Sequence, residues 1–300
     1  MSTSHRHGHA WAFLGPAVLL LLAILVFPII YSFCLSFFEA DGASWFAGTS
    51  KFIGFNNYLM LLNDPSFAHS VWLLAAYIVI TTLIELAIAL GLAIFLDQIL
   101  KVPSWMRTLL ILPMFVLPVV SGLTFRYLFD PEGGVLGTVF YWFNLEAPDM
   151  LGDPIGAFFV VVMQDVWRMW PFLFIIIFAG LKGLSRDTIE AVKMDGANLW
   201  QVCRYVILPG LKPTIVVAVL LKVIESLKAF TEIYVMTGGG PGESTTILSM
   251  YIIKQITDFS QYGFGSAAST LLLTTGIGIT LILAFFSRKE GQGKSEGELA

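Results

Sequence analysis

Charged residues are scarce in this chain of 300 residues, because Asp, Glu, Lys and Arg together make up only 13% of it. Soluble domains carry about 25% charged and roughly 45–50% apolar residues, whereas 57% of this sequence is hydrophobic and its mean hydropathy is +0.80. This composition disfavours a soluble enzyme, a nucleic-acid binder and a disordered chain. The sequence predicts a membrane protein.

Cysteine is nearly absent, since Cys34 and Cys203 are the only two, and this disfavours a secreted disulfide scaffold. Cys34 lies in the first apolar run. Cys203 lies in a basic loop that we expect on the opposite side of the bilayer. We therefore expect no structural disulfide between them.

The motifs of several enzyme classes are also missing. The sequence contains no GxxxxGK[ST] phosphate-binding loop, no HExxH zinc motif and no GxSxG nucleophile elbow. The glycine cluster at 238–242 is not followed by Lys-Ser or Lys-Thr. We therefore expect no catalytic residue, no metal site and no cofactor bound by this chain.

Six apolar runs are long enough to cross a bilayer, since a spanning helix needs about 20 mostly apolar residues. They are Trp11–Phe38, Val71–Leu96, Trp105–Phe129, Ile155–Leu181, Pro213–Met236 and Ser266–Ser287. The first run exceeds the apolar part of a typical signal peptide, so we expect it to be retained. The predicted fold class is all-α, with six transmembrane helices.

Lys and Arg are unevenly distributed among the segments between these runs. Eleven of the 17 lie in the two terminal segments and in or beside the two loops that follow the second and fourth runs, with Arg107 at the start of the third run, whereas three lie in or beside the other loops, with Arg126 at the end of the third run. The positive-inside rule then puts both termini in the cytoplasm. We expect cytoplasmic tails at 1–10 and 288–300, a membrane domain at 11–287 with a cytoplasmic loop at 182–212, and an inner-membrane location.

The loop at 182–212 is too polar to span the membrane, but its pattern predicts an amphipathic helix. Ser185 supplies a helix-capping residue, and Gly196 interrupts the pattern, which favours a turn or a close backbone approach there. Apolar residues at helical spacing are Ile189, Ala191, Val192, Leu199, Val202 and Val206. We expect Pro209 and Pro213 to separate this helix from the fifth span.

One spacing in this loop resembles the EAA signature of permease subunits of binding-protein-dependent ABC importers. It runs Glu190-Ala191-Val192, three residues, Gly196, nine residues, Val206, one residue and Leu208-Pro209, with valine replacing the usual alanine at 192 and isoleucine at 206. The resemblance implies that the loop docks an ATPase subunit. The residues expected to couple to it are Glu190, Ala191, Asp195, Gly196, Ala197, Trp200, Leu208 and Pro209. The alternative is an amphipathic helix lying on the lipid surface.

Flanking residues narrow the resemblance to the carbohydrate class that includes maltose and glycerol-phosphate permeases. They are Asp195-Gly196-Ala197, Trp200-Gln201, Thr237-Gly238-Gly239-Gly240-Pro241 and Ser244-Thr245-Thr246. The sequence looks most like the MalF-type subunit, which carries the extracellular Gly-Gly-Pro turn, although the large external domain of some relatives is missing. The resemblance implies a type I importer fold. The implied partners are a second homologous permease, two ATP-binding subunits that hold ATP and Mg, and a periplasmic solute-binding protein.

Seven ionisable side chains fall within the predicted spans, where a charge near the bilayer centre costs at least about 2.5–3.5 kcal/mol and must face protein or water. They are Glu85, Asp165, Arg168, Lys222, Glu225, Lys228 and Glu232. Helical spacing puts Asp165 and Arg168 on one face, and predicts a second stripe through 222, 225, 228 or 229, and 232.

These stripes favour a polar cavity for a hydroxyl-rich solute, because carboxylates and guanidinium groups bind sugar hydroxyls and aromatic rings stack on sugar faces. Residues that resemble the family's substrate-contact positions are Asp165, Arg168, Phe172, Lys222, Glu225 and Ser226. Internal ion pairs and contacts to the second permease are the alternatives. For Lys228 and Glu232, we expect a role in a gate or at a subunit interface. For Glu85, three roles remain open: a protonated core carboxyl, a partner of one of the lysines, or part of the pathway.

The sequence thus predicts a non-catalytic permease that imports a sugar, polyol or anionic sugar derivative by alternating access. One alternative is a proton-coupled secondary transporter that uses Glu85, Asp165 or Glu232. Another is a membrane scaffold or enzyme subunit.

Overall fold

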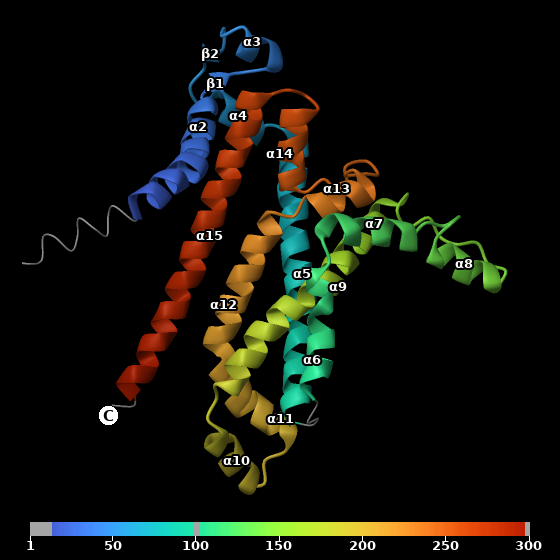
Figure 1. Ribbon diagram of the computed structural model, residues 1–300, viewed down its shortest axis with the longest axis vertical. Helices are drawn as coiled ribbons and strands as arrows, with labels where there is room; N and C mark the ends of the chain where they lie inside the picture. Colours follow the sequence, from blue (N-terminus) through green and yellow to red (C-terminus); the bar gives the residue numbers. More distant parts are fainter. Residues whose placement is uncertain (1–13, 99–102, 298–300) are drawn as a thin grey trace, which may run out of the picture. The chain divides into compact units, whose positions relative to one another are not determined.

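The computed structural model describes residues 14–98 and 103–297, which are mostly helical (Figure 1). The all-α prediction is confirmed, with one two-stranded hairpin added to it. The described residues form two compact units, 14–68 with 251–274, and 69–98 and 103–250 with 275–297.

The first unit begins with the helix Leu14–Leu35, which includes the π-helical turn η1 (Leu22–Val26) and helix α2 (Phe27–Leu35). Its next elements are β1 (Phe38–Glu39), α3 (Gly42–Phe46), β2 (Lys51–Phe52) and α4 (Asn56–Leu62). It also takes in the start of α5 (Pro65–Gln98), most of α14 (Leu248–Thr257) and the start of α15 (Tyr262–Gly297). The strands pair antiparallel, with Phe38 opposite Phe52.

Asn57 and Gly263 hold the helices of this unit against the hairpin. Asn57 is buried, and its side-chain amide donates hydrogen bonds to the backbone oxygens of Ser36 at 2.8 Å and Phe38 at 2.9 Å. The backbone N–H of Gly263 donates to Ala40 at 2.9 Å. A Cβ at position 263 would lie 2.0 Å from the backbone oxygen of Phe38, so glycine is needed for α15 to approach β1 this closely.

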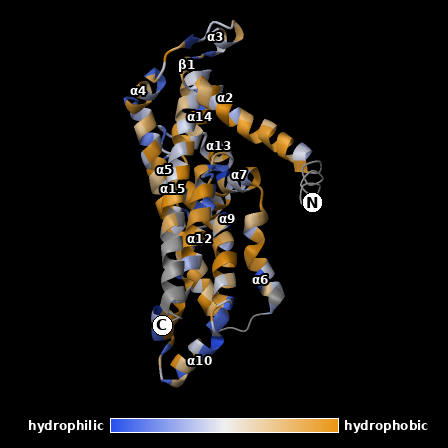
Figure 2. Ribbon diagram, turned by 90° about the vertical axis from the view of Figure 1, so that its left-hand side faces the viewer, coloured by the Kyte–Doolittle hydropathy of each residue, from blue (hydrophilic) through white to orange (hydrophobic). Residues whose placement is uncertain are grey.

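The second unit contains most of α5 and the helices that follow it. These are α6 (Ser104–Ile111), the 3-10 turn η2 (Leu112–Phe115), α7 (Pro118–Leu128), α8 (Val135–Trp142), α9 (Pro154–Lys182), α10 (Arg186–Met194), α11 (Leu199–Val202), the π-helical turn η3 (Cys203–Ile207), α12 (Leu208–Leu227) and α13 (Thr231–Thr237). Apolar residues lie along α6 and α12, whereas α10 carries a hydrophilic patch (Figure 2).

By length and composition, five helices are candidates to span a membrane, and one bent pair makes a sixth. The five are Leu14–Leu35, Pro65–Gln98, Pro154–Lys182, Leu199–Leu227 and Tyr262–Ile282. The bent pair lies within the predicted span Trp105–Phe129, and its two helices, Trp105–Phe115 and Pro118–Leu128, meet at 88°. Proline disfavours a helical conformation in the residue before it, and Leu117, which precedes Pro118, is extended with ψ 140°.

The prediction for the fifth span is wrong in two respects. Pro209 and Pro213 do not separate the loop helix from the span, because one helix runs from Leu199 to Leu227. Pro209 lies in the first turn of α12, directly after the wider π-helical turn η3, and that turn relieves the clash of a proline ring with the preceding turn. The helix then ends at Leu227 instead of continuing to Met236, so Glu232 lies on α13 and the predicted single stripe is interrupted.

An apolar cluster holds together the end of the second unit that contains α10 and α11. Its buried members come from α5, α9, α10, α11, η3 and α12: Ala89, Ala93, Leu96, Leu173, Phe174, Ile177, Leu181, Ile189, Val202, Ile207, Leu211 and Ala218. Ala89 and Ala93 are one turn apart on α5, and such small residues allow membrane helices to pack closely. The cluster therefore roots the short helices α10 and α11 in the long ones.

Candidate functional site

Farther along the same three long helices, the apolar cluster gives way to buried charges. Lys222 of α12 donates hydrogen bonds to Glu85 of α5 at 2.7 Å and to Asp165 of α9 at 2.6 Å. These three residues are at most 2% exposed. A buried charge is tolerated when it is paired and hydrogen-bonded, so the lysine compensates carboxylates from two other helices.

Arg168 extends this cluster toward α13. Its guanidinium donates to Glu232 at 3.2 Å and lies 3.9 Å from the carboxylate of Asp165. Glu225 pairs with Lys228 at 2.6 Å, but those two side chains are 45% and 63% exposed. We call Glu85, Asp165, Arg168, Lys222 and Glu232 the polar cluster. It contains three carboxylates and two cations.

A small cavity of about 20 Å³ lies within the polar cluster. Five of the six predicted solute-contact residues line it: Asp165, Arg168, Lys222, Glu225 and Ser226. Phe172 does not line it, since it packs against the apolar cluster one turn farther along α9. A volume of this size holds about one water molecule, whereas sites for small molecules usually enclose about 300–1,000 Å³. The structure thus gathers the predicted residues around a site that is closed.

Several buried polar atoms on the helices that form the polar cluster have no hydrogen-bond partner among the described residues. They are Oε2 of Glu85, Oε1 of Gln164, Nε of Arg168 and Oγ of Ser226. Most buried polar atoms in proteins find a partner. Arg168 and Ser226 line the cavity, so their two unpartnered atoms are available to a ligand or water there.

The sequence analysis missed Tyr77 and Gln164. Tyr77 is fully buried and lines the cavity, and Gln164 donates to Ser121 of α7 at 2.9 Å. A signal was present, because Tyr77, Thr81 and Glu85 recur every four residues on α5 and are all buried. That spacing defines one polar face of the helix.

The predicted coupling loop folds into two short helices around a glycine turn. Ser185 caps α10 through a bond from the N–H of Thr188. Gly196 has φ +87°, which favours glycine. Asn198 and Gln201 form a capping box at the start of α11, which the sequence analysis did not identify.

One face of this element is buried and the other is open. Ile189 and Val202 are buried in the apolar cluster, while Met194 and Trp200 are 86% and 71% exposed. Among the predicted coupling residues, those exposed are Glu190, Ala191, Asp195, Gly196, Trp200 and Pro209, and those half-buried are Ala197 and Leu208. The buried face fixes the element to the bundle, and the exposed face carries a large aromatic side chain.

Asp97 is a third residue that the sequence analysis missed. Its side chain is fully buried at the end of α5 and accepts hydrogen bonds from Lys182 of α9 and from both terminal nitrogens of Arg186 of α10, the latter at 2.9 and 2.5 Å. These bonds raise the pKa of Arg186 above its usual value. Asp97 therefore ties the start of α10 to two long helices.

The glycine-rich segment after α13 forms an ordered turn. Gly238 ends α13 with φ +64°, and Gly239 has φ +90°. Three threonine hydroxyls hold the turn: Thr237 bonds Thr245 at 2.7 Å, and Thr246 donates to the backbone oxygen of Gly239 at 3.0 Å.

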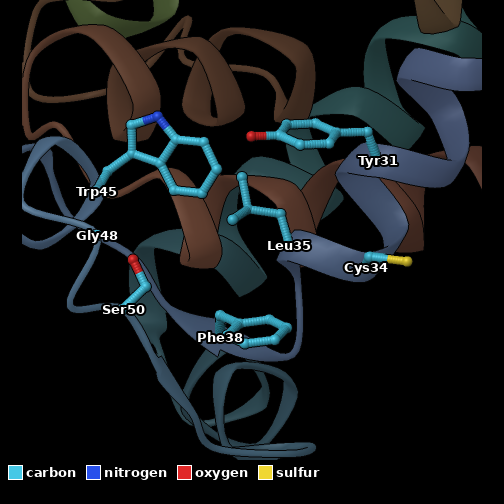
Figure 3. A pocket seen from close by; sticks show the side chains of 7 residues that line it. All are labelled: Tyr31, Cys34, Leu35, Phe38, Trp45, Gly48 and Ser50. Carbon is cyan, nitrogen blue, oxygen red and sulfur yellow. The ribbon is translucent and has the colours of Figure 1, made fainter.

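The first unit contains a separate groove of about 330 Å³ between α2 and the hairpin (Figure 3). Tyr31, Leu35, Phe38 and Trp45 line it, and the rings of Tyr31 and Trp45 meet edge to face at 5.8 Å. Leu35 lies between the rings of Trp45 and Phe38 (Figure 3). Its lining includes no carboxylate, Lys or Arg, so it has none of the charged groups that distinguish the polar cluster.

Comparison with protein families gives a match over residues 86–290 to the family described as binding-protein-dependent transport system inner membrane component. The chain is 34% identical over 269 residues to the sulfoquinovosyl glycerol transport system permease protein SmoG of Agrobacterium fabrum, covering 90% of this chain and 87% of the relative. It is 30% identical over 267 residues to the trehalose/maltose transport system permease protein MalF of Thermococcus litoralis, covering 89% of each.

The fold is similar to that of a solved bacterial ABC transporter involved in the import of the acidic polysaccharide alginate. One chain of that transporter aligns with a TM-score of 0.81 and 21% identity, covering 95% of this chain and 96% of the other. The agreement extends across nearly the whole length of both chains.

Proposed function

This chain belongs to the family of binding-protein-dependent transport system inner membrane components and is a non-catalytic permease subunit of an ABC importer, and from this premise we propose that it forms part of the import pathway for a sugar or polyol. The observation that carries the proposal is the family match, which covers Asp165, Lys222 and the whole α10–α11 element. The named sugar-related cargoes of SmoG and MalF support the solute class.

The polar cluster is the solute contact region of this proposal. The unpartnered carboxylate oxygen of Glu85 in the cluster and the unpartnered hydroxyl of Ser226 in the cavity lining are suited to sugar hydroxyls, which both donate and accept hydrogen bonds. The closed cavity is consistent with a state of the transport cycle in which no solute is bound, and the conformational change of alternating access would open it. Both cations already contact carboxylates, and the acids are in excess, so the cluster favours a neutral polyhydroxy solute over an anionic one.

Ser226 provides a sharp test of this role. Its hydroxyl has no partner among the described residues, whereas Ser121 accepts a bond from Gln164 and donates one to Pro118 at 2.9 Å. In proteoliposomes with the binding protein, Ser226→Ala is expected to reduce sugar-stimulated ATP hydrolysis without loss of stability. Ser121→Ala is expected to lower stability. Unchanged sugar stimulation in Ser226→Ala would contradict the proposed contact.

The α10–α11 element is the proposed ATPase-coupling site, with Glu190, Ala191, Asp195, Gly196, Ala197, Trp200, Leu208 and Pro209 at or beside the contact. Exposed tryptophans are frequent binding hot spots, and truncating one typically costs at least about 2 kcal/mol. Roughly thirtyfold weaker ATPase binding is therefore expected for Trp200→Ala. Trp142→Ala, at an equally exposed tryptophan of α8, is the matched control, and equal ATPase recovery from the two variants would refute the assignment.

This function implies an assembly and an orientation. The proposed partners are a second homologous permease, two subunits that bind ATP and Mg, and a periplasmic binding protein. The Lys- and Arg-rich segments, including α10 and both termini, would face the cytoplasm. Residues 1–10 and 288–300 would then be cytoplasmic tails of the membrane domain at 11–287. Mass spectrometry of the gently extracted complex tests the assembly, and recovery of a lone chain that still transports would argue against it.

A further inference from the structure

A second polar cavity lies at the end of the second unit that contains α10, outside the polar cluster. It has a volume of about 470 Å³ and is formed by the ends of α5 and α9 together with α6 and the start of α10. We call it the basic cavity. Its lining residues are Leu96, Asp97, Pro103, Arg107, Phe178, Lys182 and Arg186.

The charge in this cavity is predominantly positive. Three cationic side chains, Arg107, Lys182 and Arg186, face one lining carboxylate, Asp97. Glu190 lies near Arg186 on α10, but it is exposed and does not line the cavity. Asp97 holds Lys182 and Arg186 together from one side. The cavity therefore keeps a net positive charge that favours an anion.

The rest of the basic cavity lining is apolar and aromatic. Leu96 and Pro103 contribute apolar surface, and the guanidinium of Arg107 and the ammonium of Lys182 lie 5.6 and 5.1 Å from the centroid of the Phe178 ring. Such cation–π contacts hold cationic groups in place. A ligand that matches this lining has an anionic group next to an apolar one.

The position of the cavity along the helices further limits the class of ligand that it can bind. Asp97 and Lys182 lie at the last turns of the candidate spans Pro65–Gln98 and Pro154–Lys182. At 34 and 29 residues, both helices are longer than the about 20 residues that cross the hydrocarbon core, so their charged last turns extend beyond it into the headgroup layer. The basic cavity thus lies at the depth of lipid headgroups, on the side where anionic lipids meet clustered Lys and Arg if the proposed cytoplasmic orientation holds.

We propose that the basic cavity binds the phosphate-bearing headgroup of an anionic phospholipid, with the phosphate beside Arg107, Lys182 and Arg186 and the glycerol and acyl portions against Leu96, Pro103 and Phe178. A bound lipid would lie between α6 and the Asp97 contact that ties α10 to the bundle. The coupling element would then respond to membrane composition as well as to the ATPase.

The test measures phosphatidylglycerol bound to the assembled complex in nanodiscs by lipid mass spectrometry. Because one basic residue near an anionic surface contributes about 1 kcal/mol, Arg107→Gln is expected to bind phosphatidylglycerol roughly fivefold more weakly. This variant leaves the bonds among Asp97, Lys182 and Arg186 in place. Arg107→Lys, which keeps the charge, is expected to retain most of the bound lipid.

Arg204→Gln is the matched control, because Arg204 is an exposed cation of η3 that does not line the cavity, and its lipid content is expected to equal that of the parent. Equal lipid retention in Arg107→Gln and the parent would overturn the proposal. Displacement of phosphatidylglycerol by millimolar inorganic phosphate would also overturn it, since the ligand would then be a free phosphate. Recovery of the ATPase is recorded in the same samples, so a failed importer assembly is distinguished from a failed lipid site.

Discussion

Replacing Lys222 with methionine tests whether the polar cluster is held together by this one buried cation. The substitution keeps much of the apolar volume of the side chain but removes the ammonium that donates to Glu85 and Asp165. Asp165 retains Arg168 at 3.9 Å. Among the described residues, Glu85 forms an ion pair with Lys222 alone, so it would remain as an uncompensated carboxylate.

The expected loss of stability follows from burial and geometry. Hydrogen bonds to charged groups contribute about 1.5–3 kcal/mol each, and breaking a buried ion pair by removing one partner costs about 3–5 kcal/mol. We therefore expect Lys222→Met to lower the free energy of unfolding by about 3–5 kcal/mol. Adding Glu85→Gln to this variant is expected to restore at least half of the loss, because it removes the uncompensated charge.

SDS titration in mixed micelles, followed by tryptophan fluorescence, measures this free energy. Lys228→Met is the matched control, because Lys228 also pairs with a glutamate but is 63% exposed, and exposed pairs contribute only about 0–1 kcal/mol. The reasoning is refuted if the two lysine variants unfold at the same SDS concentration, or if Glu85→Gln deepens the loss in the Lys222→Met variant.

Three further substitutions test the coupling element and the helix contacts. Gly196→Ala introduces no clash but forces a side chain onto φ +87°, at a cost of about 1–2 kcal/mol, and we expect less ATPase in pull-downs while insertion is unchanged. Gly122→Ala would bring a Cβ within 2.6 Å of a backbone oxygen of α13, and thermal unfolding should show a loss of about 1–3 kcal/mol that the unobstructed Gly91→Ala does not. Asp97→Asn weakens the hold on Arg186 by about 1–2 kcal/mol, and the number of ATP molecules hydrolysed per solute imported is expected to rise.

The sequence predicted those parts of the fold that local patterns determine. Run length identified the spans, and the capping Ser185 and the positive-φ Gly196 were both identified in the coupling loop. The end of the fifth span was missed, because the helix breaks at Lys228 and Phe230 but apolar residues return at 233–236 and make the run look continuous. The grouping of Glu85 with Lys222 depends on contact between two helices, and the two residues are 137 positions apart in the sequence. Periodicity within one helix does not show which other helix it contacts.

The unbroken helix from Leu199 to Leu227 connects Trp200, in the proposed ATPase-coupling site, to the buried charge of Lys222. Trp200 and Lys222 are separated along it by roughly 33 Å at 1.5 Å per residue. If the helix pivots about one end by roughly 10°, the other end moves by roughly 6 Å, which is about twice the donor–acceptor distance of an ordinary hydrogen bond. A tilt of this size imposed at Trp200 is therefore enough to withdraw Lys222 from both of its carboxylates at once. The helix that closes the cavity through Lys222 is then also the helix that opens it.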